Sequence, residues 1–220
     1  MVTDDERTSA YIDSLSRINS SFLEELEVSC IRDGIPIIRK SMQNLMKFLI
    51  KAYKPADILE VGTAVGFSSI LMAETSADVH ITTIEKYEKR IPIAKENFAK
   101  SGYSDRIEFI EGDAAEVLKE LISDNRKYDM IFMDAAKGQY MNFYEDVMTL
   151  LKDGGLLVSD NVLQDGDIVQ SRFAVKRRNR TIHARMREYL KTLSKDERLT
   201  TTILPVGDGV SLSVKGSRNG

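Results

Sequence analysis

The chain has 220 residues, a formal net charge of −3 and a hydrophobic content of 42%, which suits one packed domain. The slight acidity argues against a protein coated with nucleic acid, although it leaves a local basic patch open. With one cysteine, Cys30, and two histidines, an internal disulfide is impossible and a Cys/His zinc site is disfavoured. The N-terminus is acidic where a signal peptide is basic, and no apolar run matches a membrane span. We therefore expect a cytoplasmic protein without membrane contact.

The first fifty residues predict helices, because Met42, Leu45, Met46 and Leu49 have helical apolar spacing. Short apolar runs then predict strands at 57–62, 79–85, 106–112, 128–134 and 155–161. The stretches between these runs predict helices at 67–74, 91–102, 114–122 and 140–151. Strands that alternate with helices of this length indicate a parallel sheet covered on both faces.

The C-terminal part differs, because 201–206 and 210–215 flank the turn "GDG" and the second segment alternates apolar with polar residues. This pattern predicts an antiparallel hairpin. We therefore predict a Rossmann-like α/β fold with a mostly parallel sheet and an antiparallel C-terminal hairpin strand. We expect a single domain over 1–220, with an N-terminal helical extension at 1–50 and a core at 56–215.

Ligands of open parallel sheets bind beyond the carboxyl ends of the strands. The first of these ends reads "LEVGTAVG", in which Glu60, Gly62 and Gly66 depart from the dinucleotide motif G-x-G-x-x-G. A carboxylate at this turn would repel a pyrophosphate and attract a cation. S-adenosylmethionine carries a sulfonium and an ammonium group and no phosphate, so it fits this end better than a dinucleotide does.

The next two strand ends add to this interpretation. Glu85 can accept hydrogen bonds from both ribose hydroxyls, and "GDA", with Asp113 and Ala114, is placed to lie beside the adenine. Each feature has a purely structural alternative: the glycines can serve a tight turn, and Asp113 with Glu116 can form a helix capping box. Their occurrence at successive strand ends, in the right order, favours S-adenosylmethionine.

Asp134 follows the fourth predicted strand, and Asp160 and Asn161 follow the fifth. If these strands are neighbours, they lie ~4.8 Å apart, so the side chains can converge. Two carboxylates and an amide oxygen suit Mg²⁺ or another hard divalent cation, which would activate a substrate hydroxyl. Lys137 lies on the same loop as Asp134 and is placed to accept the hydroxyl proton as general base. Alternatively, Lys137 is a solvated loop residue and "DN" only ends a strand.

The segments "DMIFMDAAKGQY", "GLLVSDNV" and "LPVGDGVSLSVK" resemble the cation-dependent class I O-methyltransferase family that includes catechol and caffeoyl-CoA methyltransferases. The resemblance runs from about Ile35 to Lys215. It implies a general base at Lys137 and a catalytic and metal-binding role for Asp134, which also contacts the cofactor. The "GDG" turn lacks the substrate-side glutamate of the catechol enzyme and matches the bacterial and plant branches better. The cofactor contacts implied by motif and resemblance together are Ile38, Glu60, Gly62, Thr63, Ser68, Glu85, Asp113, Ala114 and Asp134.

A basic run follows the predicted metal site. The range Arg172–Lys191 holds eight Lys or Arg and one Glu, although the protein as a whole is acidic. The stretch 162–175 before it has no clear periodicity and is placed to act as a substrate lid. We predict a helix that opens at Thr181, with its buried and its solvent-facing residues divided as follows: Ile182, Met186, Tyr189, Leu190 and Leu193 buried, and Arg178, Arg180, Arg185 and Lys191 toward solvent.

The segment "KRRNRTI" resembles the bacterial branch of the family that methylates 5-hydroxyuridine at the tRNA wobble position to 5-methoxyuridine. This resemblance implies an anticodon loop as partner, since arginines bind phosphates well. The rival substrate is a small catechol-like or caffeoyl-CoA-like vicinal diol, and a solvated helix face remains the plain alternative for the run. A nicotinamide oxidoreductase is disfavoured by the missing third glycine, and a silent RNA-binding module needs no metal site. We also expect a homodimer. The predicted RNA contacts are Arg172, Lys176, Arg177, Arg178 and Arg180.

Overall fold

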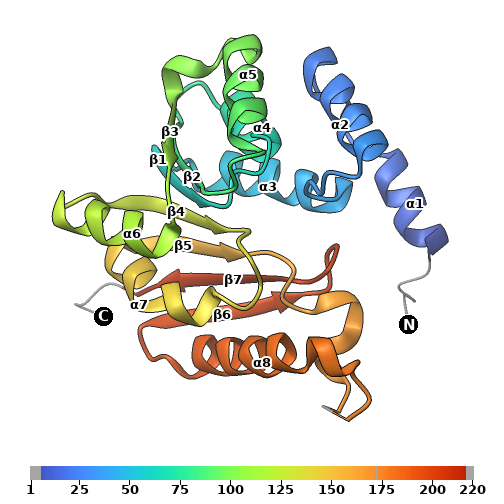
Figure 1. Ribbon diagram of the computed structural model, residues 1–220, viewed down its shortest axis with the longest axis vertical. Coiled ribbons are helices and arrows are strands. Elements are labelled where there is room, and N and C mark those ends of the chain that lie inside the picture. Colours follow the sequence, from blue (N-terminus) through green and yellow to red (C-terminus); the bar gives the residue numbers. More distant parts are fainter. Residues whose placement is uncertain (1–5, 172, 217–220) are drawn as a thin grey trace.

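The computed structural model describes residues 6–171 and 173–216, so the predicted RNA contact Arg172 lies outside the described residues. The described chain forms a seven-stranded sheet in the order β3-β2-β1-β4-β5-β7-β6 (Figure 1). The first five strands are parallel, whereas β7 runs antiparallel to both β5 and β6. The strands are β1 (Asp57–Val61), β2 (His80–Glu85), β3 (Ile107–Glu111), β4 (Tyr128–Met133), β5 (Leu151–Ser159), β6 (Leu199–Leu204) and β7 (Val210–Lys215). The predicted fold class is confirmed.

Helices cover both faces of the sheet. On one face, Ile50, Ile70 and Phe98 pack with Ile58 and other strand residues. On the opposite face, a second core joins the last helices to the alternate strand positions. Such burial on both faces explains the continuous apolar runs of the parallel strands. The helices are α1 (Glu6–Ser14), α2 (Ser21–Asp33), α3 (Lys40–Tyr53), α4 (Phe67–Thr75), α5 (Ile91–Ser101), α6 (Ala114–Ser123), α7 (Tyr140–Leu150) and α8 (Arg180–Lys195).

Helix α8 differs in detail from the prediction. It begins at Arg180, after the 3₁₀ turns η2 (Gln164–Val169) and η3 (Arg177–Asn179) in the segment before it. The predicted buried stripe is wrong at its start, because His183 is buried and Ile182 is 37% exposed. A helix rotates about 100° per residue, so a shift of one position at the first turn changes which side chain meets the sheet. The rest of the buried stripe consists of Met186, Tyr189 and Leu193, and Leu190, which was predicted with them, is half-buried against the same core.

Strand order reverses beside β1, which lies between β2 and β4. This is the switch point at which open α/β sheets bind ligands. The ends of β1, β2, β4 and β5 therefore frame one crevice. Among the described residues, the helices are too short or too polar to span a bilayer.

Candidate active site

Asp134 and Asp160 lie at neighbouring strand ends. They follow Met133 and Ser159, which are register partners in the β4–β5 pair. The amide of Asp160 donates to the carbonyl of Met133 at 3.0 Å. The buried hydroxyl of Tyr140 lies 3.0 Å from the carbonyl oxygens of both Met133 and Asp160. The two carboxylates are thus held by a backbone with defined geometry, as the strand order requires.

Asp160 is buried and Asp134 is half-buried, and removal from water changes the acidity of both carboxyl groups. Burial raises the pKa of Asp134 well above its usual value, and the negative charge of Asp160 raises it further. Burial also raises the pKa of Asp160 to about 6, with a further contribution from the charge of Asp208. Two carboxylates so removed from water repel one another unless a cation lies between them.

Asn161 completes the group. Its side-chain nitrogen donates to Asp134 Oδ1 at 3.0 Å, and its own backbone is left-handed, with φ at +60°. That conformation is uncommon outside glycine, although asparagine tolerates it best. Rotation of the amide by half a turn would present its oxygen instead of its nitrogen. The described residues contain no cluster of three His, Cys, Asp or Glu, but this set of two carboxylates and one amide fits a hard, oxygen-preferring cation.

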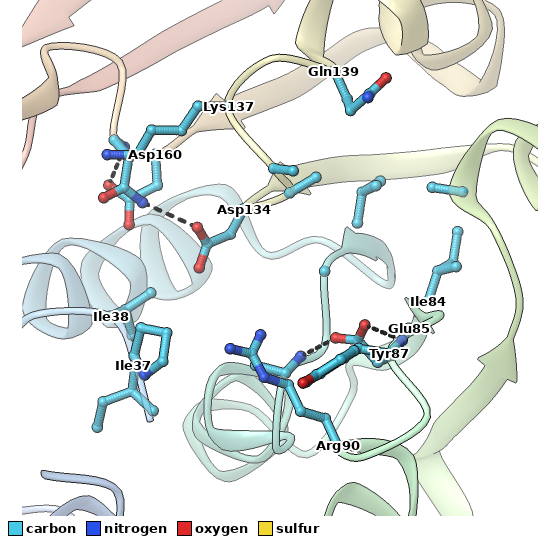
Figure 2. A pocket seen from close by; sticks show the side chains of 18 of the residues that line it. Ile37, Ile38, Ile84, Glu85, Tyr87, Arg90, Asp134, Lys137, Gln139 and Asp160 are labelled. Atoms are coloured by element: carbon cyan, nitrogen blue, oxygen red, sulfur yellow. Dashed lines mark hydrogen bonds between the residues drawn. The ribbon is translucent and has the colours of Figure 1, made fainter. Parts of the chain in front are cut away.

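A cavity of about 650 Å³ opens beside these groups. In Figure 2, Asp134, Lys137 and Asp160 lie on one side of it, and Glu85 and Tyr87 lie on the other. The cavity brings together most of the predicted site residues, which come from the ends of the five parallel strands and from the segment before α3. Those that line it are Ile38, Gly62, Glu85, Asp113, Ala114, Asp134, Lys137, Asp160 and Asn161.

Glu60, Thr63 and Ser68 do not line the cavity. They are buried behind its wall, where the Glu60 carboxylate accepts hydrogen bonds from the hydroxyls of Ser68, Ser69 and Thr83. Burial raises the pKa of Glu60 despite these bonds. Glu60 therefore ties β1 to the start of α4 and to β2. Its predicted position at the cavity surface is not observed, because side chains alternate along a strand and this one points into α4.

Glu85 is held in place by the backbone. Its Oε2 accepts a hydrogen bond from the amide of Ala64 at 2.8 Å, and its Oε1 accepts bonds from the amides of Lys86 and Tyr87 at 2.9 and 2.8 Å. Figure 2 shows its carboxylate beside Tyr87 in the cavity. Three fixed donors orient the group, and Oε2 keeps a lone pair for a ligand hydroxyl.

Asp113 combines both of the roles considered for it. It caps α6 by accepting from the amide of Ala115 at 2.9 Å, and it also lines the cavity. An ion pair of 2.8 Å with Lys86 connects it to the end of β2, and this hydrogen bond, with that from Ala115, lowers the pKa of Asp113.

Gly62 explains the close contact between β1 and β4. Its φ is +111°, and a Cβ at this position would lie 2.4 Å from the backbone oxygen of Asp134. A glycine is therefore required here because the backbone segments after β1 and β4 approach closely, whether or not Gly62 also contacts a ligand.

Several cavity residues were not predicted from the sequence. Arg39, before α3, forms an ion pair of 2.6 Å with Asp208 in the "GDG" turn. The same turn accepts backbone hydrogen bonds from Val162 and Leu163, just after Asp160 and Asn161. Asp208 could have been predicted from the antiparallel hairpin, because the turn of that hairpin must lie at the carboxyl ends of the parallel strands. Further cavity residues that were not predicted include Pro36, Ile37, Met42, Tyr87, Arg90, Gln139 and Phe143.

The basic run is only partly turned to solvent. Arg180 donates to the carbonyls of Val175 and Phe173 at 3.2 and 3.3 Å. Arg180 is therefore half-buried, and its prediction as a solvent-facing side chain is wrong, because carbonyls of the preceding loop lie within its reach. Arg185 is exposed as predicted, although it also donates to the carbonyl of Gly138 at 3.0 Å. Arg178 and Lys191 are exposed as predicted, together with Lys176 and Arg177.

Comparisons with known proteins agree with this geometry. The O-methyltransferase family model matches residues 8–216. Caffeoyl-CoA O-methyltransferase 2 of Petunia hybrida is 34% identical over 176 residues, which cover 76% of this chain and 71% of the relative.

Two solved structures have the same fold. A Staphylococcus aureus protein, provisionally named a caffeoyl-CoA O-methyltransferase, is 36% identical with a TM-score of 0.88; the match covers 96% of this chain and all of the other. The Podospora anserina methyltransferase PaMTH1, bound to SAH, is 28% identical with a TM-score of 0.86, and the match covers 99% of each chain. From the family match over nearly its whole length, the chain belongs to the O-methyltransferase family.

Proposed function

We propose that the protein is an S-adenosylmethionine- and Mg²⁺-dependent O-methyltransferase that converts 5-hydroxyuridine at the tRNA wobble position to 5-methoxyuridine. The observation that carries the chemistry is the convergence of Asp134, Asp160 and Asn161 at paired strand ends, with Lys137 on the same wall of the cavity. Two carboxylates and an amide oxygen are suited to a hard cation, and a lysine nearby can accept a proton.

S-adenosylmethionine is supported by the opposite wall. Glu85 is fixed by three backbone amides and has acceptor capacity left for ribose hydroxyls. Asp113 and Ala114 line the cavity next to it. The SAH-bound state of PaMTH1, which shares the fold over 99% of this chain, supports the same cofactor class.

Lys137 is the proposed general base. A hard divalent cation held by Asp134, Asp160 and Asn161 would supply Lewis acidity toward a substrate hydroxyl. Lys137 takes the hydroxyl proton on Nζ, and the substrate oxygen then forms a bond to the methyl carbon as the carbon–sulfur bond breaks. The electron pair of that bond stays on sulfur, which leaves S-adenosylhomocysteine.

An RNA substrate is supported by the residues before α8. Lys176, Arg177 and Arg178 are exposed, and no ion pair within the described parts of the chain involves them. Phe173, next to them, is 85% exposed. Cations beside an exposed aromatic ring suit phosphates and unpaired bases. The 5-hydroxyl and 4-oxo groups of the base form a vicinal oxygen pair like that of a catechol.

A small vicinal diol is the second candidate, because the curated relatives include caffeoyl-CoA O-methyltransferases at 34% identity. The deciding experiment incubates the protein with methyl-labelled S-adenosylmethionine and either tRNA bearing 5-hydroxyuridine or catechol, with and without EDTA. We expect label in tRNA and its loss on chelation. Label in catechol but never in tRNA would refute the RNA substrate, and label that survives full chelation would refute the metal.

The cationic surface is tested separately. The triple variant Arg177→Glu, Arg178→Glu and Lys176→Glu should weaken tRNA methylation and leave S-adenosylhomocysteine binding unchanged, because these residues lie outside the cavity. The effect should shrink at high salt, since phosphate contacts are screened. Unchanged tRNA turnover at moderate salt would show that the surface is only solvated.

We also propose that the protein is a homodimer that uses its N-terminal helices. Ile18 is 83% exposed and Leu15 is 68% exposed, and Tyr11 and Ile12 of α1 are also exposed. Clustered apolar side chains at the end of one helix are typical of a covered surface. Light scattering after gel filtration should give twice the chain mass for the wild type and the monomer mass for Ile18→Asp. A monomeric wild type would exclude the dimer.

A further inference from the structure

Arg185 lies on α8, yet its side chain reaches the loop that carries Lys137. Its Nη1 donates a hydrogen bond of 3.0 Å to the carbonyl oxygen of Gly138, which directly follows Lys137. The two residues are 47 positions apart in the chain. The contact is therefore tertiary and joins the basic helix to the wall of the cavity.

The loop at 135–139 has few other anchors. The backbone bond from Gln139 to Ala136, at 2.8 Å, closes a local turn, and the side chain of Gln139 accepts from Asn142 at the start of α7. Within the described chain, the bond from Arg185 is the hydrogen bond that ties this loop to a distant element. Apart from it, the position of Lys137 depends on these local turns and on the packing of Ala135 against the core.

Helix α8 is itself a rigid support. Tyr189 is buried, and its hydroxyl hydrogen-bonds to Ser159 Oγ at 2.7 Å, at the end of β5. Its ring packs edge-on against Tyr140, with centroids 5.3 Å apart. Arg185 lies one turn before Tyr189, so its guanidinium is carried by a helix that is fixed to the strand ends.

Two other α8 residues show that this contact is specific. Arg187 donates to the carbonyls of Ile168 and Gln170, in and after η2, and so it holds the opposite loop. Lys191 is exposed and makes no side-chain hydrogen bond or ion pair with the described residues. The three side chains are all cationic, but only that of Arg185 is bonded to the loop that carries Lys137 among the described residues.

We infer that Arg185 is a positioning residue for methyl transfer, which holds the loop at 135–139 so that Lys137 stays at the cavity wall. The inference rests on the proposed role of Lys137 as base. A base acts only within hydrogen-bond reach of the proton it takes, so a loosened loop lowers the fraction of molecules in the reactive arrangement. A charge-assisted hydrogen bond of this kind should account for about three- to tenfold in kcat.

The experiment compares Arg185→Gln, Arg185→Lys, Arg187→Gln and Lys191→Gln in the full chain. The assay uses S-adenosylmethionine, Mg²⁺ and whichever of the two candidate substrates, tRNA bearing 5-hydroxyuridine or catechol, the wild type methylates. Arg185→Gln should lower kcat and leave the KM for that substrate within about twofold, since the residue does not line the cavity. Arg185→Lys should recover part of the loss, and Lys191→Gln should match the wild type.

Hydrogen exchange supplies a readout that needs no activity. Amides of the segment 135–141 should exchange faster in Arg185→Gln, whereas those of 164–171 should exchange faster in Arg187→Gln. In a Lys137→Met background, Arg185→Gln should cause no further loss of residual turnover, because it acts through Lys137. If the wild type methylates neither substrate, the proposed function fails. The exchange measurement still tests whether Arg185 holds the loop at 135–139 in place.

Three outcomes would overturn the inference: unchanged exchange in 135–141, a kcat within about twofold of the wild type, or an equal further loss in the Lys137→Met background. If Arg185→Gln lowers the melting temperature enough to raise exchange along the whole chain, Arg185→Lys replaces it as the test variant. Arg185→Lys keeps the charge and a donor, and the inference then requires that its exchange is faster in 135–141 alone.

Discussion

The hydroxyl of Tyr140 donates to the carbonyl oxygen of Asp160 across the gap between two strand ends, at 3.0 Å. The same hydroxyl is 3.0 Å from the carbonyl of Met133, directly before Asp134. One side chain at the start of α7 thus sets the spacing of the backbone segments that present both carboxylates. Its ring is almost fully buried, so water cannot replace the hydroxyl.

Tyr140→Phe should therefore weaken Mg²⁺ binding by about tenfold, as loss of an outer contact commonly does at metal sites. Calorimetric titration of the purified protein measures this affinity. Tyr144→Phe is the matched control, since its hydroxyl bonds to Asp196 at 2.6 Å, away from the strand ends. Both variants should lose about 1 kcal/mol of unfolding free energy, but only the first should lose metal affinity. Equal Mg²⁺ affinities would contradict the role of Tyr140.

The acidity of Asp160 predicts how the metal-free protein responds to pH. Burial, followed by the charge of Asp208, raises its pKa from 3.8 to about 6. A carboxyl group whose pKa is higher in the folded chain stabilises the fold at low pH, and this stabilisation is lost as pH rises through the folded value. In EDTA, the contribution of Asp160 to the free energy of unfolding should fall between about pH 4 and pH 6, by at most about 3 kcal/mol.

Added Mg²⁺ should reverse this loss, so the rise in melting temperature that it causes should be larger at about pH 7.5 than at about pH 5. Asp208→Asn should move the transition to lower pH, because the negative charge that raises the pKa of Asp160 is removed. A Mg²⁺ effect that does not vary with pH would show that Asp160 is not the group that binds it.

Gly62→Ala should destabilise the protein by at least about 3 kcal/mol, because strain and overlap act together. The new methyl group would lie 2.4 Å from the backbone oxygen of Asp134, at a φ of +111°. Gly34→Ala is the control, with a φ of +64° and no atom within 4 Å of the added carbon; its cost should be about 1 kcal/mol. Urea unfolding measures both, and similar losses would mean that the β1–β4 approach is not tight.

Glu85→Gln should reduce the affinity for S-adenosylhomocysteine by at least about tenfold, since an amide nitrogen would then face backbone N–H donors. The amides of Lys86 and Tyr87 need an acceptor at this place. Glu111→Gln, at the end of the edge strand β3, removes the same charge outside the cavity and should leave binding unchanged. Equilibrium titration of the cofactor product compares the two variants, and equal affinities would exclude Glu85 from the cofactor site.

The sequence was sufficient for the strand ends and insufficient for side-chain direction. Asp134 and Asp160 could be placed together because parallel strands end at one edge of a sheet. The face of β1 on which the side chain of Glu60 lies could not be predicted, because the spacing of Glu60 and Gly62 is the same for either face. The pairing of Arg39 with Asp208 joins segments far apart in the chain, and no local pattern encodes such a contact. The hydrogen bonds of Arg180 and Arg185 were not predicted for the same reason, because their acceptors are loop carbonyls.

The antiparallel β7 has a consequence for how the substrate side can change. Because β6 and β7 form a hairpin, the turn at Gly207–Gly209 returns to the edge at which the parallel strands end, and it receives the amides of Val162 and Leu163. A parallel β7 would have needed a crossover helix and would have left this edge open. One short turn therefore borders the proposed substrate side of the cavity, whereas the ends of β1 and β2 border the proposed cofactor side. If these assignments hold, substitution or lengthening of that turn should alter substrate choice and leave the binding of S-adenosylmethionine unchanged.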